Sequence, residues 1–152
     1  MDNPLSYLNY SEFMQNAIIA ALNTKAFPNP KVAAVLTDIK GNIKATGVHH
    51  GPGTNHAEID LLNKTTIDKD DILYVTLEPC FHADSSPSCA VELLNTSLQN
   101  IVIGDIDVDP RTNGKSIDLF KSKGLNIQFE YNANNIITVS YTHLTLPTKR
   151  IV

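Results

Sequence analysis

The chain has 152 residues, of which 42% are apolar and 18% are charged, and its formal net charge at pH 7 is −4. This length and composition exclude a disordered chain and indicate one globular domain that can bury a core without disulfide bonds. The acidic balance argues against a nucleic-acid partner, because phosphate binding usually requires a basic face. No stretch approaches the roughly 18 apolar residues of a membrane span and no secretory signal begins the chain, so we expect a cytoplasmic protein with no membrane partner.

The first half of the chain predicts a helix, a β-hairpin and a second helix. Apolar residues recur at helical spacing through residues 11–24, with Ser11 as the expected N-cap, and two prolines that follow end this helix. Residues 32–36 and 42–48 predict two strands joined by a tight turn that contains glycine. Residues 55–62 predict the next helix.

The second half of the chain alternates short apolar strands with helices. Strands are predicted over residues 71–76, 100–104 and 126–131, and helices over residues 89–98 and 116–123. This alternation is typical of parallel strand pairing with helices on both faces of a sheet. We therefore expect an α/β fold, a three-layer αβα domain with a mixed sheet of about five strands.

The end of the chain lies beyond this pattern. We expect one domain over residues 1–137 and a separate tail over residues 138–152, which resembles translated read-through of a sequencing adapter and is then not native. A genuine short tail, or the start of a linker, is the alternative.

One histidine and two cysteines form a candidate metal site. In a reducing compartment two cysteines are more often ligands or catalytic groups than a disulfide. His56, Cys80 and Cys89 supply one imidazole and two thiolates, a donor set that suits Zn²⁺. Three protein ligands leave a fourth position for water, as in catalytic zinc sites, and bound zinc lowers the pKa of that water toward 7. The pattern thus predicts catalytic zinc; a structural zinc and a pair of spectator or disulfide-bonded thiols are the alternatives.

Glu58 is the candidate catalytic residue. It lies two positions beyond His56, at the start of a predicted helix, where its carboxylate can stay beside the metal-bound water. A carboxylate there can take a proton from water and deliver it to a ring nitrogen and then to a departing amine. A His-x-Glu motif followed by Pro-Cys is the described signature of zinc nucleobase deaminases, so this role comes from recognising the motif.

From about Tyr10 to Tyr131 the chain resembles the pyrimidine deaminase domain of the bifunctional deaminase/reductase of riboflavin biosynthesis, within the cytidine deaminase-like superfamily. The resemblance is carried by Pro28-Asn29-Pro30-Lys31-Val32, by Gly47-Val48-His49 leading to His56-Ala57-Glu58, by Tyr74-Val75-Thr76-Leu77-Glu78-Pro79-Cys80-Phe81-His82, and by Pro87-Ser88-Cys89. Eight residues separate the two cysteines here, as in the riboflavin-pathway enzyme. Cytidine, deoxycytidylate and tRNA adenosine deaminases place two there.

This resemblance implies a cytidine deaminase-like fold and hydrolytic deamination of 2,5-diamino-6-ribosylamino-4(3H)-pyrimidinone 5′-phosphate. Zinc hydroxide would attack the ring carbon that bears the 2-amino group, releasing ammonia. The resemblance also implies that Asn29 hydrogen-bonds the substrate and that His49, Ala57 and His82 line the substrate pocket. A turn residue at Asn29 and solvated loop histidines at His49 and His82 are the alternatives.

The loop between the cysteines departs from the family pattern. Ser85 stands where the family has a basic residue, and Asp84 adds a negative charge beside it. A charge-assisted contact with phosphate is therefore lost, unless Arg111 or Lys115 supplies it. A deaminase of another small pyrimidine or purine, and a catalytically inactive zinc-stabilised scaffold for a partner enzyme, are the alternative functions.

The expected partners follow from the same resemblance. The small-molecule substrate is a pyrimidine nucleotide. The reductase half of the family and a glycine-rich dinucleotide motif are not found in this sequence, so a separate reductase is a candidate partner. Association into a homo-oligomer is also expected by resemblance.

Overall fold

The computed structural model describes residues 11–26, 29–83 and 88–130. In this part of the chain nine helices and strands follow one another in the order that the apolar periodicity predicts. They are α1 (Glu12–Leu22), β1 (Ala33–Thr37), β2 (Ile43–Val48), α2 (Ala57–Leu62), β3 (Ile72–Val75), α3 (Cys89–Leu94), β4 (Asn100–Ile103), α4 (Lys115–Ser122) and β5 (Asn126–Phe129). Ser11 caps α1 as predicted, accepting a hydrogen bond from the backbone of Met14. The predicted tail, residues 138–152, lies outside the described residues.

The helix predicted over residues 89–98 is shorter in the structure and ends at Leu94. Thr96 closes this end: its hydroxyl donates to the carbonyl of Leu93 at 2.6 Å and accepts from the backbone N–H of Leu98 at 3.1 Å. The resulting turn places Leu98 in the core, with 2% of its surface exposed. A side-chain hydrogen bond to the backbone thus replaces the last helical turn while the apolar residue remains buried.

The five strands form one mixed sheet in the order β2-β1-β3-β4-β5. β1 pairs antiparallel with both β2 and β3, whereas the pairs β3–β4 and β4–β5 are parallel. The parallel pairs follow from the helical crossovers, because a strand can return in the same direction only after such a connection. The mixed five-stranded sheet that the sequence predicts is confirmed.

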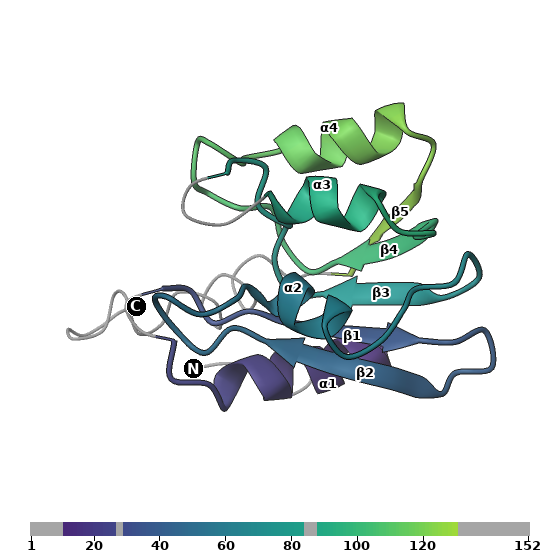
Figure 1. Ribbon diagram of the computed structural model, residues 1–152, viewed down its shortest axis with the longest axis horizontal. Coiled ribbons are helices and arrows are strands. Elements are labelled where there is room, and N and C mark those ends of the chain that lie inside the picture. The colour runs from purple at the N-terminus through teal and green to yellow at the C-terminus, as the bar shows by residue number, and fades with distance from the viewer. Residues whose placement is uncertain (1–10, 27–28, 84–87, 131–152) are drawn as a thin grey trace.

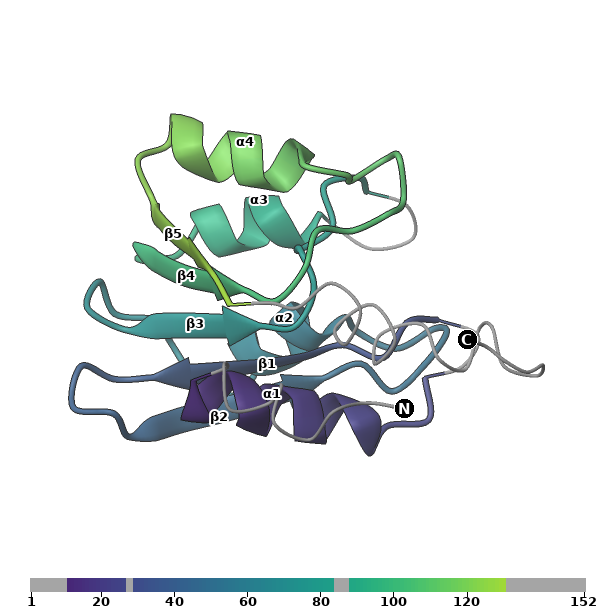
Figure 2. The same ribbon diagram turned by 180° about the vertical axis from the view of Figure 1, so that it is seen from behind.

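Helices cover both faces of this sheet, so the described domain has three layers (Figures 1 and 2). α1 packs on one face, and α2, α3 and α4 pack on the other. β1 contributes to both cores because successive side chains of a strand point to opposite faces: Ala33 and Val35 pack under α1, and Ala34 and Leu36 pack under the other three helices. None of the helices in residues 11–26, 29–83 and 88–130 combines the length and apolar character needed to cross a bilayer.

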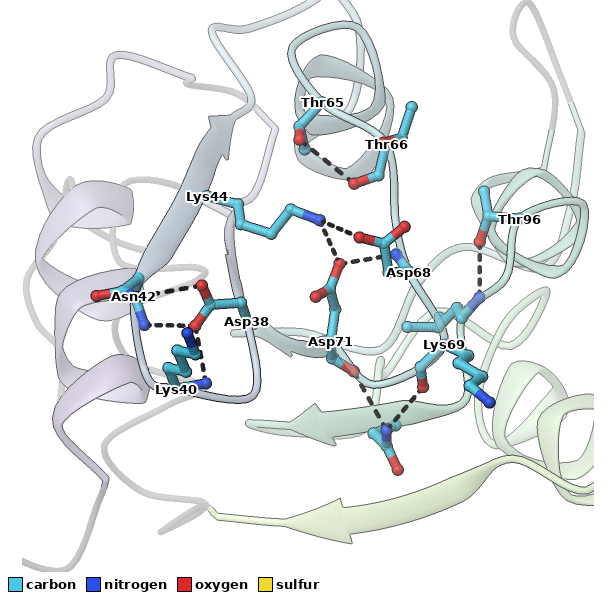
Figure 3. Close-up of polar contacts among 12 residues, drawn as sticks. Asp38, Lys40, Asn42, Lys44, Thr65, Thr66, Asp68, Lys69, Asp71 and Thr96 are labelled. Carbon is cyan, nitrogen blue, oxygen red and sulfur yellow. Dashed lines mark hydrogen bonds and ion pairs between the residues drawn. The ribbon is translucent and has the colours of Figure 1, made fainter.

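Carboxylates organise the loops at one end of the sheet (Figure 3). Asp38 accepts hydrogen bonds from the backbone N–H groups of Lys40 and Asn42, each at 2.9 Å, and so fixes the turn between β1 and β2. The carboxylate of Asp71 is nearly buried and lies 2.6 Å from the ammonium of Lys44 on β2. These contacts join the hairpin to the loop before β3 and leave the opposite end of the strands for the functional site.

A close approach of two backbones holds α2 against the hairpin. A Cβ atom at Gly47 on β2 would lie 2.1 Å from the carbonyl oxygen of Ala57 and 2.6 Å from the backbone nitrogen of Leu61. Only glycine therefore lets the first turn of α2 sit at this depth. The carboxylate of Asp60, on the same helix, accepts a hydrogen bond from the backbone N–H of Val48 at 2.9 Å. This bond fixes the position of α2 along β2.

We expect Gly47→Ala to destabilise the fold by about 3 kcal/mol, because the added methyl group forces α2 away from β2. Gly53→Ala is the matched control: its φ of +82° is costly for alanine, by about 1 kcal/mol, but no heavy atom lies within 4 Å of the added Cβ. Denaturant unfolding of both variants measures the difference. Equal losses of unfolding free energy in the two variants would show that the contact between α2 and β2 is not constrained at Gly47.

Candidate active site

Three separate elements bring the predicted metal ligands together. His56 occupies the N-cap position of α2 with extended backbone angles, and its side chain makes no capping hydrogen bond. Cys89 is the first residue of α3, and Cys80 lies in the loop that follows β3. Ser88 links the Cys80 loop to α3. Its hydroxyl donates a hydrogen bond to the carbonyl of Cys80 at 3.1 Å and also caps the start of α3.

The donor atoms of these residues form one compact group. The Nδ1 atom of His56 lies 3.5 Å from the Sγ atom of Cys80 and 3.4 Å from the Sγ atom of Cys89. All three donor atoms lie within 4.8 Å of one another, and the cysteines are not joined in a disulfide. One imidazole nitrogen and two thiolate sulfurs at this spacing fit Zn²⁺, which prefers nitrogen and sulfur donors in tetrahedral geometry.

The two thiols titrate very differently. The hydrogen bond from the Cys89 thiol, helped by His56, lowers the pKa of Cys80 to about 4. The same contact with Cys80, together with burial, raises the pKa of Cys89 above its ordinary value. In this thiol pair one proton is therefore held more tightly than the other. A metal that binds both sulfurs displaces this proton, because coordinating thiols are deprotonated.

Glu58 lies in the first turn of α2, with 3% of its surface exposed. Burial, followed by repulsion from the Cys80 thiolate, raises the pKa of its carboxyl group to about 7. A cation bound at the neighbouring donors acts in the opposite direction and favours the carboxylate. A carboxyl group poised near neutrality in a cavity is suited to accept and return a proton.

These groups face a cavity of about 620 Å³, a volume within the usual range of small-molecule sites. Seven of the eight residues that the sequence singles out line it: Asn29, His49, His56, Ala57, Glu58, Cys80 and His82. The eighth, Cys89, is fully buried at the base of the site. Asp84 and Ser85, where the sequence departs from the family, lie outside the described residues.

Glu78 belongs to a motif that carries the family resemblance, but the sequence does not reveal its structural role in the site. Its carboxylate is 2% exposed and accepts four backbone hydrogen bonds, at 2.9 to 3.4 Å, from Asp107, Gly114, Ser116 and Ile117. Burial raises the pKa of this group, and the four N–H donors oppose that shift. Glu78 thereby fastens one wall of the cavity, residues 107–111, beside the Cys80 loop.

Thr112 is a second residue whose structural role in the site the sequence does not reveal. Its side chain is fully buried, and its hydroxyl accepts from the backbone N–H of Phe81 at 3.1 Å and lies 3.0 Å from the Nδ1 atom of His82. The threonine thus holds the ring of His82 at the cavity wall. The sequence predicts that His82 lies at the pocket, but Thr112 carries no motif that marks it.

Arg111 and Lys115, the two residues that could supply a positive charge for the substrate phosphate, lie in different places. Arg111 lines the cavity and pairs with Asp109, with 2.8 Å between its Nη2 atom and the carboxylate. That contact, with hydrogen bonds from Arg111 as the main cause, lowers the pKa of Asp109 to about 2. Lys115 lies over the ring of Phe81, 6.0 Å from its centroid, and is not among the described residues that line the cavity.

Comparison with known proteins agrees with this geometry. Residues 8–105 match the family described as the cytidine and deoxycytidylate deaminase zinc-binding region. A diaminohydroxyphosphoribosylamino-pyrimidine deaminase of Buchnera aphidicola subsp. Schizaphis graminum is 34% identical over 102 residues, which cover 66% of this chain and 69% of that protein. The riboflavin biosynthesis protein RibD of Aquifex aeolicus is 30% identical over 139 residues, covering 88% of this chain and 39% of that protein.

A solved structure shares the fold. The diaminohydroxyphosphoribosylaminopyrimidine deaminase/5-amino-6-(5-phosphoribosylamino)uracil reductase of Thermotoga maritima superposes with a TM-score of 0.80 at 27% identity, over 91% of this chain and 41% of that one. This chain therefore spans about two fifths of the length of these longer proteins. It belongs to the cytidine and deoxycytidylate deaminase family and groups within it with the deaminases of riboflavin biosynthesis.

Proposed function

We propose that this protein is a zinc-dependent deaminase that hydrolyses the 2-amino group of 2,5-diamino-6-ribosylamino-4(3H)-pyrimidinone 5′-phosphate. The observation that carries the proposal is the buried carboxyl group of Glu58, which faces the cavity beside the His/Cys/Cys group. Burying a carboxyl group costs free energy. A purely structural zinc site has no use for it, which argues against an inactive scaffold.

Each residue has a role in this proposal. His56, Cys80 and Cys89 hold zinc, which when bound supplies a Lewis acid that makes water ionise near neutral pH. Glu58 accepts one proton from water and gives it to a ring nitrogen; it then takes the second proton from the hydroxyl group added to the ring and gives it to the leaving amine. Water and the aminopyrimidine are consumed, and the uracil-type ring and ammonia are formed.

The choice of substrate rests on the relatives and on the spacing of the ligands. The Buchnera and Thermotoga proteins are named for deamination of the diaminopyrimidine phosphate. The loop of eight residues between the cysteines favours this substrate over cytidine or tRNA adenosine. Asn29, Ala57 and His82 line the cavity in which the ring would lie, and Arg111, which also lines it, is our candidate for contacting the phosphate. A reductase would then use the product, since the Thermotoga protein is named for both steps.

We expect the purified protein to release ammonia from this substrate and Glu58→Gln to reduce kcat by on the order of 10² to 10⁴, because glutamine cannot carry the proton. Zinc content should be unchanged in this variant. Glu92→Gln, which alters a carboxyl group on α3 that does not line the described cavity, is the control and should retain activity. Equal turnover by Glu58→Gln and the wild type would remove Glu58 from the mechanism.

We further expect about one zinc per chain, measured by elemental analysis, and strongly reduced zinc content in Cys80→Ser and in Cys89→Ser. A chelator should abolish ammonia release, and added zinc should restore it. Full activity in protein stripped of metal would contradict the assignment of His56, Cys80 and Cys89 as ligands of a catalytic ion.

A further inference from the structure

His49 lies at the cavity wall just after β2, yet only 4% of its surface is exposed. Its two ring nitrogens both meet protein groups: Nδ1 lies 2.9 Å from the backbone carbonyl of Asn55, and Nε2 lies 2.8 Å from the amide nitrogen of Asn29. The resemblance to the family implies that His49 lines the substrate pocket, where its ring could contact the substrate. The contacts leave neither ring nitrogen for that purpose.

The surroundings of Nδ1 fix which ring nitrogen carries the proton. A backbone carbonyl such as that of Asn55 can only accept, so Nδ1 must donate to it. Thr54 lies 3.4 Å from the same nitrogen, and its own hydroxyl proton goes to the carbonyl of Gly51 at 2.6 Å. Thr54 is therefore also restricted to accepting from Nδ1.

With the proton on Nδ1, the other nitrogen of a neutral ring is an acceptor. The ring is almost fully buried and its Nδ1 atom already donates to a carbonyl group, so Nε2 can act as the acceptor of a neutral ring. Nε2 then receives a hydrogen bond from the side-chain N–H of Asn29. This contact removes the usual ambiguity of an asparagine amide, because only its nitrogen can face an acceptor.

The orientation of Asn29 has a direct consequence for binding. Its amide nitrogen is directed to His49, so its carbonyl oxygen is the acceptor that it can offer to a molecule in the cavity. No other partner of this side chain occurs among residues 11–26, 29–83 and 88–130. A flipped amide would place two acceptors, Oδ1 and Nε2, against each other.

We propose that His49 is a positioning residue that fixes the amide of Asn29, so that the Asn29 carbonyl oxygen accepts a hydrogen bond from an N–H donor of the substrate. The ligand class is thus a heterocycle with a ring N–H or an exocyclic amino group at that edge. The identity of the substrate rests on the proposed function, whereas the orientation of the Asn29 amide does not.

The orientation of the Asn29 amide can be tested without measuring enzyme turnover. In the zinc-loaded full chain with ¹⁵N-labelled histidine, we expect the NMR signals of His49, assigned by their loss in His49→Phe, to report a neutral ring protonated at Nδ1. Asn29→Ala should shift the Nε2 signal by removing its donor, whereas Asn95→Ala, at the end of α3, should not. A ring protonated at Nε2, or an Nε2 signal indifferent to Asn29→Ala, would overturn the proposal.

Kinetics test the consequence for substrate. His49→Phe keeps an aromatic ring but removes the acceptor, so it should raise KM about tenfold, as should Asn29→Ala, with kcat and zinc content nearly unchanged. The double variant should show no further loss, because both changes remove one hydrogen bond. His49→Gln restores an acceptor and should recover most of the affinity.

His50→Gln, which alters the exposed neighbouring histidine, is the control. Additive losses in the double variant, or equal losses in His49→Phe and His49→Gln, would show that His49 acts independently of Asn29. A wild-type protein that does not act on the diaminopyrimidine phosphate would refute the proposed function alone, because the NMR measurement needs no substrate.

Discussion

Two sulfurs, an imidazole and a carboxyl group lie together at one end of the sheet, with Cys89 and Glu58 buried and His56 and Cys80 half-buried, and the free-energy cost of burying such groups constrains the rest of the site. Such groups are stable in a dry interior when a cation or hydrogen bonds compensate them. The donors of His56, Cys80 and Cys89 lie within 4.8 Å of one another, close enough to share an ion. An ion held there would offset the negative charge of Glu58, whose pKa burial otherwise raises.

Backbone contacts supply the rigidity that this arrangement needs. The approach of α2 to Gly47 sets the position of His56 and Glu58, and the four N–H groups gathered by Glu78 set the opposite wall. Thr112 then holds His82 at that wall. Catalytic groups held by elements rather than by free loops keep their geometry between turnovers, since little reorganisation is left for the reaction itself.

The sequence predicts those parts of the protein that depend on local pattern. Helical spacing and Ser11 predict α1, and the donor chemistry of the cysteines predicts a metal group that the structure brings together. The end of α3 was not predictable from periodicity, because Leu98 continues the apolar pattern while Thr96 breaks the helix. The roles of Glu78 and Thr112 depend on partners about 30 residues away in the chain, and no local pattern encodes such distances.

The place of β1 in the sheet has a consequence for how the three donor residues come together. β1 lies between β2, its hairpin partner, and β3, the first strand of the parallel half. The histidine ligand follows the hairpin and both cysteines follow β3, so the donor set spans the seam between the two halves. Neither half alone brings all three donor residues together. Binding of an ion by all three residues would therefore require that β1 has paired with β3 and joined the two halves.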